Sequence, residues 1–108
     1  MLVSATTGSK QLCIFEQWIA PELGAPTHAH PNEEVLTVLA GGADLWIEDD
    51  YIILSAGQSL IVPARRKHGF RNVGATMLHM YAVLSSAGFE ALYDGSPEPV
   101  RRWFVPKE

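Results

Sequence analysis

Short apolar segments recur along the chain and are separated by glycine, proline and aspartate. Their apolar positions follow a two-residue period better than a helical one, as where Ala43, Leu45 and Ile47 alternate with polar or aromatic neighbours. β-Branched and aromatic residues are common within them. The segments cover residues 11–20, 34–40, 43–47, 51–54, 59–62 and 77–85. This pattern predicts an all-β fold, a small antiparallel barrel or sandwich.

The last quarter of the chain departs from the strand pattern, with a helix candidate followed by an apolar tail. Residues 86–93 are the best candidate for a helix, a short one that Gly95 would end. The tail at 100–105 contains Trp103 and Phe104 and is too apolar to remain in water. We therefore expect that it folds back as an edge strand or that it meets a second subunit.

Length and charge narrow the class of protein. A chain of 108 residues is expected to form one domain, covering residues 1–108. The net charge of -4 argues against a nucleic-acid partner, since binding a phosphate backbone needs a basic surface. No apolar run approaches the roughly 18 residues that cross a bilayer, so we expect a cytoplasmic protein with no membrane partner. Cys13 has no second cysteine to pair with.

Histidine and glutamate side chains gather in the sequence THAHPNEE at 27–34. On an extended segment His28 and His30 point to the same side. Glu34 begins the next strand-like run, where its carboxylate can point inward. Two imidazoles and a carboxylate suit a first-row transition metal. The alternative is that these residues are polar groups on a surface loop, which is the usual reason for an isolated histidine pair.

Two spaced motifs strengthen the metal interpretation. The first consists of His28, His30, Glu34 and Gly41, and the second of Gly57, Pro63, His68 and Asn72. In this spacing and order the chain resembles the cupin superfamily, in particular its small single-domain members. Two glycines of the family pattern are replaced, by Glu22 and by Arg65. A left-handed Arg65 would cost about 1–2 kcal/mol, so we expect its turn to adopt a different form.

The resemblance implies a jelly-roll barrel, also called a double-stranded β-helix, with one metal ion inside it. His28, His30, Glu34 and His68 would be the ligands, leaving two of six octahedral positions open. Fe, Mn, Ni, Co, Cu and Zn all suit this ligand set. Small barrels of this family commonly pair, so a homodimer is expected, with the apolar tail as its interface.

His79 and Tyr81 are candidates for catalytic residues. They share one face of the strand-like run 77–85 and could line the cavity near the metal. The alternative places His79 on the outer or interface face. Arg65, Arg66 and Lys67, with the nearby Arg71, form a basic cluster beside His68, which would attract an anionic substrate if it lay at the cavity mouth. Otherwise it is a solvated turn.

Three functions remain open at this point. The first is a metal-dependent enzyme acting on a small molecule, for instance an anionic or aromatic one. Dioxygenase-like chemistry is favoured, with lyase, decarboxylase or isomerase chemistry as alternatives. The second is a non-catalytic barrel that binds or senses a small molecule with the help of the metal. The third is a structural barrel without metal.

Overall fold

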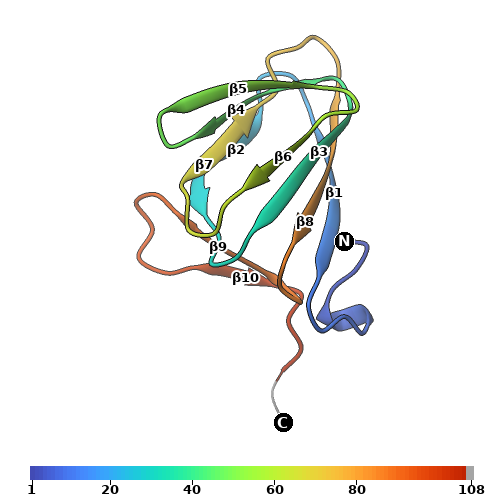
Figure 1. Cartoon of the computed structure of the whole chain (residues 1–108), viewed down its shortest axis with the longest axis vertical. Coiled ribbons are helices and arrows are strands. Elements are labelled where there is room, and N and C mark those ends of the chain that lie inside the picture. Colours follow the sequence, from blue (N-terminus) through green and yellow to red (C-terminus); the bar gives the residue numbers. More distant parts are fainter. Residues whose placement is uncertain (107–108) are drawn as a thin grey trace.

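The computed structural model describes residues 1–106 and consists mainly of β-strands (Figure 1). Within these residues there are ten strands and one short 3₁₀ helix, Ala5–Thr7. The strands are β1 (Cys13–Ile19), β2 (Gly24–Ala29), β3 (Glu34–Ala40), β4 (Gly42–Ile47), β5 (Asp50–Ser55), β6 (Ser59–Val62), β7 (His68–Arg71), β8 (Leu78–Leu84), β9 (Phe89–Tyr93) and β10 (Val100–Arg102). Each of the six apolar segments found in the sequence contributes a strand, so the all-β prediction is confirmed.

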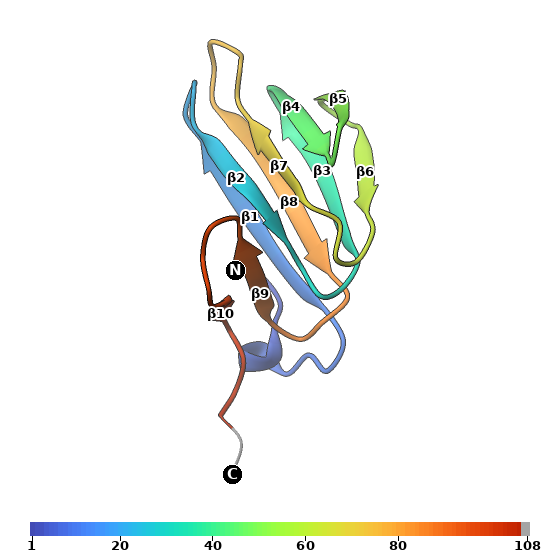
Figure 2. The same cartoon turned by 90° about the vertical axis from the view of Figure 1, so that its left-hand side faces the viewer.

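Two antiparallel sheets form the walls of the molecule. One has the strand order β1-β8-β3-β6 and the other β10-β9-β2-β7-β4-β5. Strands adjacent in a sheet are often far apart in sequence, as with β1 beside β8 and β2 beside β7. In Figure 2 the strands β2 and β7 lie in front of β1 and β8, which belong to the other sheet. This crossing between layers is the jelly-roll arrangement.

The two-residue period of the strands decides which side chains enter the core. Along β8 every second residue is buried, from Leu78 to Leu84, while the residues between them are only half-buried. Strand β3 has the same alternation and buries Glu34, Leu36 and Val38. The two inner faces meet in one apolar cluster. The carboxylate of Glu34 is therefore carried inside by the same alternation that buries leucine and valine.

The predicted short helix at 86–93 is wrong. Residues 89–93 form strand β9, in which Phe89 and Ala91 are buried and Glu90 is not. Strand β9 pairs with β10 on one side and with β2 on the other. Tertiary pairing thus overrides a weak local helix preference. Among residues 1–106 the structure contains no helix with the length and apolar character needed to cross a membrane.

The C-terminal tail folds back as an edge strand, which was one of the two expected outcomes. Strand β10 pairs with β9, and the Trp103 ring packs against Phe15 and Phe89 at centroid distances of 5.3 and 6.0 Å. Phe104 lies so close to Gly88 that a Cβ there would come within 2.7 Å of its ring. The aromatic tail residues therefore cover their own barrel.

The turn between β6 and β7 differs from expectation. Arg65 has φ +66°, which is the left-handed conformation that the sequence analysis expected the chain to avoid. The Arg65 N–H donates a 2.7 Å hydrogen bond to the carbonyl of His30, and this bond joins the turn to the segment between β2 and β3. The motif glycines Gly41 and Gly57 also have positive φ, at +84° and +89°, where glycine meets no steric penalty.

Candidate metal centre

Strands β2, β3 and β7 bring four polar side chains together inside the barrel. His28 lies opposite His68 in the antiparallel pairing of β2 with β7. His30 follows β2 by one residue, and Glu34 is the first residue of β3. All four side chains are buried, with at most 5% of any residue exposed. One ring nitrogen from each histidine lies within 4.8 Å of the others.

A β-bulge in β2 sets the direction of His28. Ala25 pairs with Phe70 and His28 pairs with His68. His28 lies three residues after Ala25 on β2, whereas their partners on β7 are only two residues apart, so β2 contains one extra residue. In a regular strand, residues three apart face opposite sides. Because a bulge inserts one extra residue, both Ala25 and His28 line the interior. The sequence prediction did not include this irregularity.

Main-chain carbonyl groups orient all three imidazole rings. The Nδ1 atoms of His28, His30 and His68 lie 2.6, 2.8 and 2.9 Å from the carbonyl oxygens of Pro26, Glu90 and Arg66, respectively. A carbonyl can only accept a hydrogen bond, so each Nδ1 carries the proton. In the neutral ring the Nε2 lone pair is then free. This arrangement is typical of metal-binding histidines.

Glu34 faces two of these nitrogens. Its Oε1 lies 3.1 Å from Nε2 of His68, and its Oε2 lies 3.4 Å from Nε2 of His30. The second contact does not satisfy hydrogen-bond geometry, and Nε2 of His30 has no hydrogen-bond partner among residues 1–106. With neutral rings, lone pairs on nitrogen and oxygen would face one another. A cation between them, either a proton or a metal ion, removes this repulsion, so the residues fit a metal ion.

The pKa values of Glu34, His30 and His28 show how burial and the neighbouring groups set the charge of each side chain. Burial would raise the pKa of Glu34, but the imidazoles of His30 and His68 outweigh it and hold that pKa well below its usual range. Burial opposes protonation of His30, yet the Glu34 carboxylate and the Glu90 carbonyl raise its pKa overall. The pKa of His28 falls to about 4, mainly through burial. Glu34 is thus an anion, and His28 is a neutral imidazole at pH 7.

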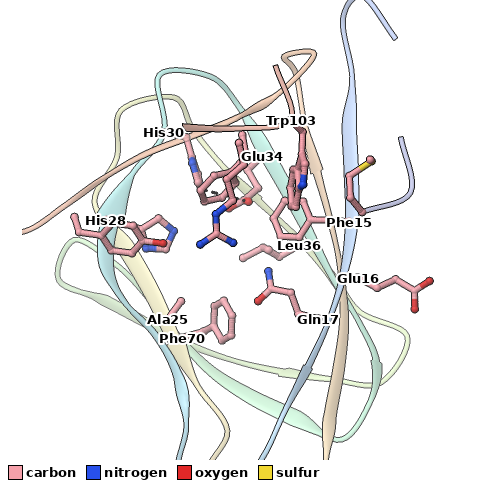
Figure 3. A pocket seen from close by; sticks show the side chains of 14 residues that line it. Phe15, Glu16, Gln17, Ala25, His28, His30, Glu34, Leu36, Phe70 and Trp103 are labelled. Atoms are coloured by element: carbon pink, nitrogen blue, oxygen red, sulfur yellow. Dashed lines mark ion pairs between the residues drawn. The ribbon is translucent and has the colours of Figure 1, made fainter. Parts of the chain in front are cut away.

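A cavity of about 310 Å³ lies beside this group (Figure 3). His28, His30 and Glu34 line it on one side, and Gln17 points into it from β1. Tyr93 and Arg102 also contribute to its wall. The apolar part of the wall is formed by Phe15, Ala25, Leu36, Phe70, Phe89 and Trp103. The arrangement is a small, largely apolar site with a few polar groups on one face, as small-molecule sites usually are.

The two predicted catalytic residues, His79 and Tyr81, do not reach this cavity. They occupy the positions of β8 between its buried residues and therefore face outward. Nε2 of His79 lies 2.7 Å from a carboxylate oxygen of Glu16, and its ring stacks on Trp18 at 4.7 Å. The Glu16 side chain points away from the cavity in Figure 3. Both residues have the outward parity of β8, which is the alternative position given for His79 in the sequence analysis.

The basic cluster also lies apart from the cavity. Arg66 pairs with Glu48 at 3.1 Å and Lys67 with Asp94 at 3.1 Å, all four being exposed. Nε of Arg71 donates to the carbonyl of Glu22. The cation at the cavity wall is Arg102 instead.

Sequence reasoning missed Gln17, Tyr93 and Arg102. Gln17 shares parity with Phe15, so the alternation of β1 could have indicated that it faces inward. Tyr93 and Arg102 belong to β9 and β10, whose pairing depends on contacts distant in the sequence.

Asn72, the last residue of the second motif, is buried but does not line the cavity. Its side-chain amide donates hydrogen bonds to the carbonyls of Ile19 and Thr76, so it supports a loop.

The family model of the cupin domain matches residues 15–84, and the chain belongs to the cupin family. This confirms the resemblance drawn from the two motifs. No curated protein matches the chain.

Several solved structures share the fold. An uncharacterized conserved protein with a double-stranded β-helix domain from Klebsiella pneumoniae is 19% identical, with a TM-score of 0.71 over 80% of this chain and 73% of that chain. Oxalate decarboxylase from Bacillus subtilis is 19% identical, with a TM-score of 0.79 over 85% of this chain but 26% of that chain. An oxalate oxidase in complex with the substrate analogue glycolate is 22% identical, with a TM-score of 0.72 over 78% and 46% of the two chains.

Proposed function

We propose that the protein is a metal-dependent enzyme in which His28, His30, Glu34 and His68 hold one divalent transition-metal ion. The observation that carries this proposal is the convergence of three oriented imidazoles, two of which face the buried carboxylate of Glu34. Fe, Mn, Ni, Co, Cu and Zn are all compatible with these ligands. The Mn(II) centres of the oxalate decarboxylase with the same fold support a metal enzyme.

The bound ion would supply Lewis-acid and redox chemistry, and the chain's own residues would bind and position a small molecule beside it. Phe15, Leu36 and Phe70 present apolar surface that excludes water from the cavity. Gln17 offers an amide to a polar group of the ligand. These groups give the cavity a polar end near the histidines and an apolar remainder.

We favour dioxygenase-like chemistry because the cavity has few groups for proton transfer. Apart from the proposed ligands, the titratable side chains at its wall are Glu16, Tyr93 and Arg102. Glu16 is paired with His79 outside the cavity. Tyr93, whose ring lies 5.1 Å from that of His28, is then the one candidate acid or base among the described residues. A reaction dependent on the metal rather than on a protein base fits this lining.

Metal content tests the proposal directly. We expect the purified or reconstituted protein to contain about one equivalent of a transition metal by elemental analysis. Glu34→Gln removes the buried negative charge, so it should bind metal more weakly by more than the roughly 10–100-fold loss typical of groups that merely orient a ligand. Glu33→Gln is the matched control, since Glu33 is exposed and should leave metal content unchanged. Less than about a tenth of an equivalent in the wild type would refute the metal site.

A non-catalytic binding barrel is the second candidate, and the scarcity of acid–base groups in the cavity favours it. Oxygen uptake by the metal-loaded protein with catechols, flavonols, thiols and keto acids separates the two. Turnover that Glu34→Gln abolishes supports the enzyme. Shifts in the metal spectrum without turnover of any compound support the binding protein.

A further inference from the structure

We infer that Arg102 is the anion-binding residue of the cavity and that the ligand is a small carboxylate with a second oxygen donor. The carboxylate would bind Arg102, and the second donor would face the histidine cluster. This inference names the substrate class of the proposed function. The contact between the second donor and the histidine cluster rests on that proposed function. The carboxylate contact rests on Arg102 alone.

Arg102 differs from its neighbour Arg101 because alternate residues of a strand face opposite sides. Arg101 forms a 2.8 Å ion pair with Glu90, and its guanidinium lies 4.4 Å from the centroid of the Phe104 ring. The guanidinium of Arg102 lies 5.8 Å from the centroid of Phe89, which is itself part of the cavity wall. The two arginines are therefore equally charged but occupy different environments.

Arg102 has no polar partner of its own in the part of the chain that the structure describes. Among residues 1–106 it forms no ion pair within 4.0 Å and donates no side-chain hydrogen bond, whereas Arg66, Lys67 and Arg101 each pair with a carboxylate. A guanidinium presents donors in a planar fork that matches a carboxylate. Arg102 is exposed, so an incoming ligand can reach it.

The charges of the site also favour an anion. A divalent ion with Glu34 leaves one positive charge, and Arg102 adds a second at the wall of the same cavity. Gln17, which points into the cavity, can donate to another oxygen of the ligand. The cavity of about 310 Å³ is at the lower end of the roughly 300–1,000 Å³ of small-molecule sites, so the ligand is small.

Calorimetric titration with glycolate, pyruvate and lactate tests the inference, with glycolamide as the uncharged control. We expect one or more of the three carboxylates to bind the metal-loaded wild type more tightly than glycolamide. Arg102→Gln should weaken that binding by about tenfold or more without changing metal content or glycolamide binding. Arg102→Lys, which keeps the charge without the fork, should be intermediate. Arg101→Gln is the matched control and should bind as the wild type does.

The inference is overturned if the Arg102→Gln variant binds every carboxylate as tightly as the Arg101→Gln variant. It is also overturned if no carboxylate binds the wild type better than glycolamide. Metal content separates this failure from failure of the proposed function. A protein that takes up no metal but still binds a carboxylate through Arg102 would refute the metal centre and retain the anion-binding residue.

Discussion

At the scale of single residues, the three histidines of the centre obtain their orientation from the main chain. Each Nδ1 donates to a backbone carbonyl, of Pro26, Glu90 or Arg66. Substitution of a neighbouring side chain leaves such a carbonyl in place, so ring orientation depends on the backbone path. One part of that path is the turn at Arg65, which is bonded to the carbonyl of His30 and has a left-handed conformation.

Replacing Arg65 with glycine should stabilise the protein. The change removes the cost of about 1–2 kcal/mol of a left-handed non-glycine residue and adds about 0.5–1 kcal/mol of glycine chain entropy. We expect a net gain of about 0.5–1 kcal/mol in the free energy of unfolding, measured by urea denaturation. Arg66→Gly is the control. Arg66 lacks a positive φ and pairs with Glu48, so that change should be destabilising. Equal losses in both variants would contradict the expectation.

At the scale of elements, the hairpin of β9 and β10 completes the cavity. It supplies the Glu90 carbonyl that orients His30 and the wall residues Phe89 and Arg102. The sequence predicted a helix over part of this hairpin, although the alternation of Phe89, Ala91 and Tyr93 was visible. A five-residue segment is too short for its period to separate strand from helix, so pairing with β2 decided the outcome.

Trp103 anchors this hairpin, so truncating it should destabilise the fold. Its ring contacts Phe15 and Phe89, and it is half-buried. We expect Trp103→Ala to lower the free energy of unfolding by about 2–3 kcal/mol, somewhat less than the ~3–5 kcal/mol for a fully buried aromatic residue. Tyr51→Ala is the control at a residue that is 80% exposed, where the change should stay within about 0.5 kcal/mol. Similar losses at both positions would contradict an anchoring role.

At the scale of the whole molecule, both sheets expose apolar side chains on their outer surfaces, with Tyr51 and Ile53 at 80% and 74% on the six-stranded sheet. The outer face of β1-β8-β3-β6 exposes Trp18 and Ile61, at 62% and 58%. Nε2 of His79 and a carboxylate oxygen of Glu16 lie 2.7 Å apart on this face, so neither side chain is an isolated polar group there. A second copy could therefore pack against this face.

We propose that the homodimer expected from the sequence forms through this face rather than through the tail, because Trp103 already packs on its own barrel. Light scattering should give about twice the chain mass of 11.8 kDa. Trp18→Asp should shift the mass to that of one chain, while Tyr51→Asp, on the outer face of the other sheet, should not. A wild-type mass of one chain would refute the dimer.

The sequence by itself determined the strands of the core and the four residues of the candidate centre. Strong alternation over 34–40 and 77–85 identifies strands locally, and the histidine and glutamate spacings are visible without any coordinates. These local patterns do not state whether a given side chain faces the inside or the outside of the barrel. His79 and Tyr81 show this, because the structure places the side chains of Leu78, Met80 and Leu84 inside, and with the opposite parity these two residues lie outside.

Only the tertiary structure decided the composition of the cavity. The bulge that turns His28 inward, the carbonyls that orient the imidazoles and the position of Arg102 all arise from pairing between strands distant in the chain. Such pairing depends on long-range register, and a shift of one residue would move each side chain to the opposite face. The physical reason is therefore that local spacing identifies the four residues of the candidate centre, whereas register decides how their side chains and the cavity wall are oriented.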